Sequence, residues 1–158
     1  MRALIAVALC AFGFTASAAE QGCEKLAWNL DLERYLLAHP EASPGAGLPV
    51  SRQLALWPAA DAGLPKAPER TSRAEGAKAA HLSFTVPEAG LYRVTLSSEA
   101  WLDLIQADAY RRAQAFTGVR DCPGLRKSVR FQLDAGLAVV QISGSTADTI
   151  GVVVTQDR

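Results

Sequence analysis

The stretch HLSFTVPEAGLYRVTL, residues 81–96, decides the fold class. Apolar side chains alternate with smaller or polar ones on both sides of a Pro-Glu-Ala-Gly turn at 87–90, which is typical of two strands that each bury one face. The alternating apolar positions are Leu82, Phe84, Val86, Tyr92, Val94 and Leu96. The stretch therefore predicts two short strands that point these side chains inward.

Similar short strands are predicted on both sides of this stretch, over 52–57, 101–106, 114–117, 129–133, 138–142 and 150–154. Turn residues separate most of them, and this spacing predicts an all-β fold, an antiparallel sandwich. In the strand at 129–133, Val129, Phe131 and Leu133 are expected to point inward. Ser128, Arg130 and Gln132 are then expected to point outward.

Two segments leave alternatives open. Residues 26–32 alternate like a half-buried strand, but Asp31 could instead cap a short helix through Leu37 with Leu32, Tyr35 and Leu36 on one face. The connection at 58–80 is rich in alanine, proline, glycine and charge, so it either wraps the surface or stays mobile.

The first nineteen residues are typical of a secretory signal peptide. Arg2 precedes an apolar run over 3–14, and Ala16-Ser17-Ala18 supplies small residues for cleavage. We therefore expect a periplasmic or secreted protein with one β-sandwich domain over 20–158, of which 80–156 is the best-defined part. No later segment is long and apolar enough to predict a membrane-spanning helix.

Two cysteines, Cys23 and Cys122, follow the predicted signal peptide, whereas Cys10 lies inside it. An even number of cysteines without metal-ligand spacing predicts one disulfide in an oxidising compartment. The alternative is two separate free thiols.

The sequence lacks the common signatures of catalysis. His39 and His81 are its only histidines and lie in unlike contexts, so we expect no metal site, no cofactor and no serine triad. Trp28, Trp57 and Trp101 could stack on sugars, although their alternating apolar contexts favour packing in the core or a sheet.

Two resemblances follow from the whole pattern. The order of strands and turns over 81–156 resembles bacterial pre-peptidase C-terminal domains, which implies a small jelly-roll sandwich in an exported protein. Segments around Trp28, 67–70, 100–103 and 122–131 resemble small exported proteins that carry a homogentisate 1,2-dioxygenase label. That activity needs iron held by two histidines and a carboxylate. We do not assign it to this chain, because its two histidines, His39 and His81, lie in unlike contexts.

The formal net charge is zero, but the charge is unevenly distributed. Residues 20–50 carry a net charge of −3 and residues 111–130 a net charge of +5. The candidate binding residues are the cations of the basic stretch: Arg111, Arg112, Arg120, Arg126, Lys127 and Arg130. Arginine suits carboxylate and phosphate groups, so the partner could be an acidic envelope glycan, a lipid headgroup or a protein. Alternatively, these cations pair internally with the acidic segment.

We therefore expect an exported binding module that recognises an anionic or carbohydrate component of the cell envelope. The alternatives are a small extracytoplasmic enzyme, either a hydrolase or a mislabelled dioxygenase, and a structural accessory subunit. Zero net charge and the predicted export argue against a nucleic-acid partner.

Overall fold

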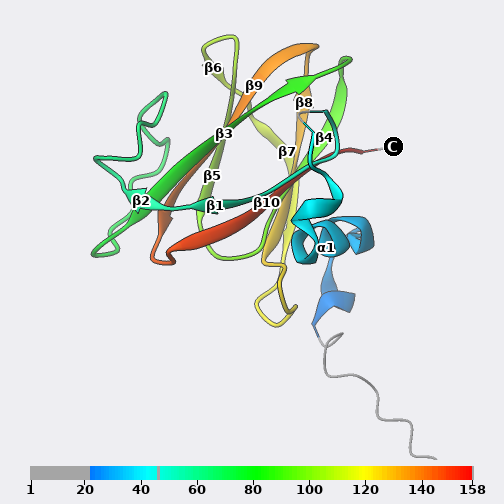
Figure 1. The fold of residues 1–158 in the computed structure, drawn as a ribbon, viewed down its shortest axis with the longest axis horizontal. Coiled ribbons are helices and arrows are strands. Elements are labelled where there is room, and N and C mark those ends of the chain that lie inside the picture. Colours follow the sequence, from blue (N-terminus) through cyan, green and yellow to red (C-terminus); the bar gives the residue numbers. More distant parts are fainter. Residues whose placement is uncertain (1–21, 46, 158) are drawn as a thin grey trace, which may run out of the picture.

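The computed structural model describes residues 22–45 and 47–157, which form two five-stranded antiparallel sheets packed face to face (Figure 1). The first sheet has the order β1 (Val50–Ala55), β10 (Thr149–Gln156), β4 (Gly90–Leu96), β8 (Lys127–Leu133) and β7 (Ala113–Gly118). The second has the order β2 (Trp57–Pro58), β3 (Lys78–Val86), β9 (Gly136–Ser145), β5 (Trp101–Gln106) and β6 (Ala109–Tyr110). The predicted all-β sandwich is confirmed.

The core lies between the sheets and is built from the alternating side chains that the sequence predicts to be inward. Strands β4 and β8 pair so that Tyr92 lies opposite Phe131 and Val94 opposite Val129. Eight of the nine predicted inward side chains are buried, and Leu82 is half-buried. Because side chains alternate with a period of two, this outcome fixes the register of the central strands.

The short strand β6 was not predicted. It forms a tight hairpin with β5, in which Ile105 lies opposite Tyr110 and Gln106 opposite Ala109. The two turn residues, Ala107 and Asp108, have φ angles of 52° and 58°, a combination typical of a two-residue hairpin turn. Such turns usually carry glycine or asparagine, so this one has no strong sequence signature.

The predicted strand at 26–32 is wrong, and the helical alternative is correct. A short 3-10 helix at Cys23–Lys25 is followed by an irregular segment, by α1 (Asp31–Ala38) and by a second 3-10 helix at Pro40–Ala42. Asn29 forms hydrogen bonds with both the backbone N–H and the side chain of Asp31, so it supports the start of α1.

The face that α1 buries also differs from the prediction. Leu32 and Tyr35 are 51% and 55% exposed, whereas Glu33 and Leu36 are buried. The cause is the surface that α1 covers, because α1 packs against β10 and β1 and the polar groups of the first sheet hold Glu33 (Figure 1). The expectation that Leu32, Tyr35 and Leu36 share the buried face is therefore wrong for two of the three.

The predicted disulfide is present between Cys23 and Cys122, with a Cα–Cα distance of 4.7 Å. Around it lies a second apolar cluster that includes Leu30, Val119 and Leu125. The N-terminal segment thereby covers the outer face of the first sheet. This cover explains why Ser128 points outward as predicted and is nevertheless buried, hydrogen-bonded by the hydroxyl of Thr95.

The connection between β2 and β3 wraps over the outer face of the second sheet. The backbone N–H groups of Lys66 and Glu69 donate hydrogen bonds to Gln141 and Asp103, and the hydroxyl of Tyr110 donates to the carbonyl of Ala67. Of the two alternatives for this segment, the surface wrap is confirmed.

The predicted signal peptide, residues 1–19, lies outside the described residues. Within the described ranges, no helix is both long and apolar enough to cross a membrane.

Candidate functional site

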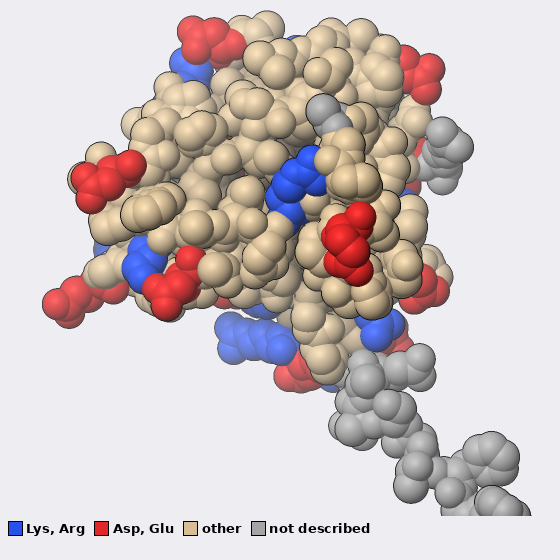
Figure 2. Space-filling view, in the orientation of Figure 1, with Lys and Arg blue, Asp and Glu red and all other residues tan. Residues whose placement is uncertain are grey.

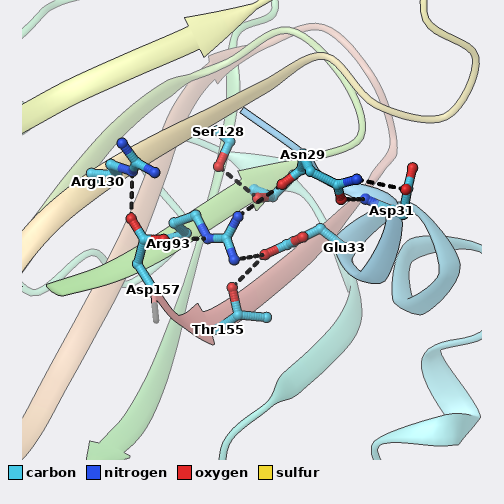
Figure 3. Close-up of polar contacts among 9 residues, drawn as sticks. Asn29, Asp31, Glu33, Arg93, Ser128, Arg130, Thr155 and Asp157 are labelled. Carbon is cyan, nitrogen blue, oxygen red and sulfur yellow. Dashed lines mark hydrogen bonds and ion pairs between the residues drawn. The ribbon is translucent and has the colours of Figure 1, made fainter. Parts of the chain in front are cut away.

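A buried polar network joins the N-terminal segment, the first sheet and the C-terminal residues on the outer face of the sandwich (Figure 3). At its centre, Arg93 of β4 lies 3.3 Å from the carboxylate of Glu33 in α1, and it donates a 2.9 Å hydrogen bond to the carbonyl of Asn29. The hydroxyl of Thr155 in β10 donates to Glu33 over 2.6 Å. Glu33 is 1% exposed, so its charge depends on these partners.

Arg130, one of the six candidate binding residues, belongs to this network. Its Nε atom lies 2.5 Å from Asp157, which also contacts Arg93 at 3.5 Å, and its guanidinium lies 4.0 Å from the centroid of the Trp28 ring. Arg130 therefore serves to attach the N-terminal segment and the C-terminal residues to the first sheet.

The other candidate cations do not pair with the acidic N-terminal segment either. In the described part of the chain, Arg111 pairs with Asp134 and Arg126 with Glu99, both outside residues 20–50. The cation that meets the acidic segment is Arg93, which lies outside the basic stretch. The described ion pairs therefore contradict the alternative that the cations of residues 111–130 pair with the acids of residues 20–50.

A groove of about 1000 Å³ opens where β5 and β6 of the second sheet face β7 and β8 of the first. Four of the six candidate cations line it: Arg111, Arg112, Arg126 and Lys127. They come together because the chain crosses from the second sheet to the first at Arg111 and Arg112, and returns to the groove at the start of β8. Arg120 and Arg130 are not among the lining residues.

Apolar and aromatic side chains form part of the groove wall. Phe116 of β7 lies opposite Val129 in the register with β8, so both point toward the inner side of the first sheet. Val129 and Phe131 continue into the core, whereas Phe116 is 76% exposed at the sheet edge. An exposed phenyl ring beside several cations offers both apolar and ionic contacts to a ligand.

The lining carries five cations against three acids, and two of the acids, Glu99 and Asp103, are engaged. Glu99 pairs with Arg126, and the buried Asp103 accepts hydrogen bonds from Trp101, Gln141 and the backbone of Glu69. Arg112 is exposed and has no acidic partner among the described residues. The groove therefore has an excess of positive charge.

Lys127 is partly buried in the groove. Burial lowers its pKa below the usual 10.5, and the neighbouring Arg126 and Arg70 lower it further, against the opposing effect of Glu99 and Asp103. Its ammonium donates a hydrogen bond to the carbonyl of Ala100 and lies 5.9 Å from the centroid of the Trp101 ring. An anion bound beside Lys127 would compensate for this loss of hydration.

Sequence reasoning missed several residues of the groove. Arg70 lies in the long connection, 5.4 Å from the ring centroid of Trp101, and nothing in its local sequence indicates that position. Trp101 itself was expected to pack, and it lies half-buried at the groove with the cations of Arg70 and Lys127 near its ring. Phe116 did carry a signal in the sequence, because it is the one large apolar residue of a short strand whose other residues are small or polar.

The remaining residues that the sequence singled out lie elsewhere. His39 is exposed and lies 3.2 Å from Glu41, and His81 is exposed on β3. Among the described residues, no group of three or more His, Cys, Asp or Glu side chains could hold a metal ion. Trp28 is half-buried as expected, but Trp57 is 60% exposed because its strand is a two-residue sheet edge, so the expectation that it packs is wrong.

Basic side chains do not form a broad field on the face drawn in Figure 2, where isolated groups of both signs are scattered over an uncharged surface. This distribution agrees with the formal net charge of zero. The clustering of four candidate cations in one groove is therefore a local feature of the fold.

Comparisons with protein-family models, with curated proteins and with solved structures find no match. The resemblance to pre-peptidase C-terminal domains stays a prediction.

Proposed function

We propose that this chain is an exported binding module that recognises an anionic ligand in the groove between β5–β6 and β7–β8. The observation that supports this most is the convergence of Arg111, Arg112, Arg126 and Lys127 beside an exposed phenyl ring. The shared chemistry of the ligand is a carboxylate or phosphate group, for which the planar fork of arginine and the ammonium of lysine are suited. Export from the cytoplasm, inferred from residues 1–19, places this ligand in the cell envelope or outside the cell.

The state of the groove cations favours ion recognition. Burial lowers the pKa of Lys127, so a bound anion would favour its charged form. Arg112 lies at the crossing between the sheets, exposed and without an acidic partner in the described chain. These two residues can form new ion pairs at little cost to the existing structure.

Two of the three acids of the groove favour binding over catalysis. Asp103 is held by Trp101, Gln141 and the backbone of Glu69, and Glu99 pairs with Arg126. Carboxylates engaged in this way position their neighbours, and they are poorly placed to exchange protons with a substrate.

Isothermal titration of the chain from Glu20 onward with three anionic probes tests the proposal: oligogalacturonate, phosphatidylglycerol vesicles and a glutamate-rich peptide. We expect at least one to bind, and Arg112→Glu to weaken that binding by about tenfold or more without changing the melting temperature. Arg120→Glu is the matched control, because Arg120 is also exposed but is not among the residues that line the groove. Absence of binding by all three probes, or equal loss in both variants, would overturn the proposal.

A further inference from the structure

The edge of β7 differs from the other sheet edges of the described chain. Strands β2 and β6, at the edges of the second sheet, have two residues each. Strand β1 carries Arg52, whose guanidinium donates hydrogen bonds to the carbonyls of Ser43 and Gly45. Short length, charge and an overlying segment are the usual ways in which proteins protect a sheet edge from pairing with another chain.

Strand β7 has little of this protection. It is six residues long, reads AQAFTG and contains no charged residue and no proline. Its pairing with β8 is irregular between Ala113 and Ala115, but the register from Ala115 to Gly118 is regular. Among the described residues, no other strand pairs with the outer edge of this regular stretch, although the N–H of Ala27 donates a hydrogen bond to the side chain of Thr117 within it. The outward N–H and C=O groups of this stretch can therefore form backbone hydrogen bonds with an added strand.

Along the groove side of β7 lie a cation, an aromatic ring and a second cation, which the neighbouring strand β8 supplies. Arg112 directly precedes β7, Phe116 points to the inner side opposite Val129, and Gly118 lies opposite Lys127. Because every second residue of an added strand would face the groove, acidic residues four positions apart could reach the two cations. The aliphatic stem of a third acidic side chain, midway between them, would contact Phe116.

The opposite wall of the groove is also an incompletely paired strand edge. Strand β6 pairs only with Ile105 and Gln106 of β5, and the N–H of Arg111 donates to the carbonyl of Leu104 over 2.7 Å. In an antiparallel strand the backbone groups of alternate residues point the same way, so those of Leu102 point to this edge as well. An extended chain fits a groove bordered in this manner.

We propose that the anionic ligand of this groove is an extended acidic polypeptide segment that adds a sixth strand to the first sheet along β7. This inference rests on the proposed function and names its ligand class. Backbone hydrogen bonds to β7 supply sequence-independent affinity, and side chains that alternate into the groove supply specificity. Charge complementarity selects acidic segments, since five cations and three acids, two of them engaged, line the groove.

The test uses a blocked heptapeptide of alternating glutamate and valine, measured by isothermal titration with the chain from Glu20 onward. Two further versions carry N-methyl groups, one on every valine nitrogen and the other on every glutamate nitrogen. Because only alternate N–H groups of an added strand face β7, we expect one methylated version to bind about tenfold or more weakly and the other to retain most of the affinity.

Variants of the chain provide the second arm. Phe116→Ala is expected to weaken binding of the unmethylated peptide by about fivefold or more, whereas Leu137→Ala leaves it unchanged. Both side chains are large, exposed and located on strands, but Leu137 does not line the groove. A lysine–valine peptide of the same length is expected not to bind.

Each contrary outcome identifies what fails. Equal binding of both methylated peptides and the parent, or binding of oligogalacturonate or phosphatidylglycerol vesicles but not of the peptide, overturns strand addition and leaves the anion-binding proposal standing. No binding of any anionic probe overturns both. If sedimentation shows a dimer that Phe116→Ala dissociates, and no peptide binds, the partner of β7 is a second copy and the inference is wrong.

Discussion

Replacing Arg93 with methionine removes the centre of the buried network and leaves Glu33 without its cation. The side chain of Arg93 is 14% exposed and contacts Glu33 at 3.3 Å, Asp157 at 3.5 Å and the carbonyl of Asn29 at 2.9 Å. In the variant, Glu33 retains the hydroxyl of Thr155, while Asp157 retains Arg130. The variant therefore has one carboxylate buried without a compensating charge.

The expected cost is about 3 to 5 kcal/mol of unfolding free energy, the range for breaking a buried ion pair by removing one partner. Urea unfolding at pH 7, with the disulfide intact, measures this value. The double variant Glu33→Leu with Arg93→Met removes both charges, and we expect it to recover most of the loss because no unpaired charge stays buried. The difference between the double variant and the two single variants gives the coupling between Glu33 and Arg93.

Lys25→Met is the matched control for this experiment. Lys25 and Asp121 form an ion pair whose two side chains are largely exposed, so the expected loss is less than about 1 kcal/mol. A loss below about 1 kcal/mol in Arg93→Met would refute the reasoning, since it would mean that water reaches Glu33. An equally destabilised double variant would refute it as well.

Three further predictions concern the core, the disulfide and the groove. Phe131→Ala should cost about 3 to 5 kcal/mol in urea unfolding, whereas Leu137→Ala should cost less than about 0.5 kcal/mol, and equal losses would show that the register of β8 is wrong. Reduction of the Cys23–Cys122 disulfide, which joins residues 99 apart, should lower the free energy of unfolding by roughly 4 to 5 kcal/mol, and an unchanged urea midpoint would contradict this. The pKa of Lys127 is lowered in the folded protein, so the unfolded chain keeps this proton to a higher pH. The unfolding free energy of the wild type should therefore rise relative to that of Lys127→Met as the pH rises toward 10.5. A difference in unfolding free energy that does not change with pH would contradict this.

The sandwich could be predicted because its central strands carry their own signals. In 81–96, alternation and a turn together specify two strands and their inward faces, and the structure buries Phe84, Val86, Tyr92 and their partners as expected. These signals are local, because each strand needs only one apolar face that it buries in the shared core.

The N-terminal region could not be predicted in the same way. Burial of Glu33 in place of Leu32 and Tyr35 depends on Arg93 and Thr155, which come from distant strands. A helix of eight residues has too weak a pattern to indicate which face is buried when its partner surface is polar.

The candidate site was predicted in part. The basic stretch indicated Arg111, Arg112, Arg126 and Lys127, of which the first two lie at the crossing between the sheets and the last two at the start of β8. Alternation separates Arg130 from them, since Val129 and Phe131 point inward and Arg130 does not. Arg70 could not be found, because only the path of the long connection over the second sheet brings it to Trp101.

Chemical-shift mapping of the ¹⁵N-labelled chain, titrated with the anionic probe that binds most tightly, is the most direct test of the groove as the binding site. We expect the largest changes at Arg112, Phe116 and Lys127, with the region around Trp28 and Arg130 unaffected because it is held in the buried network. Changes centred on Trp28 and Arg130, with none at Arg112, Phe116 and Lys127, would contradict the assignment of binding to this groove.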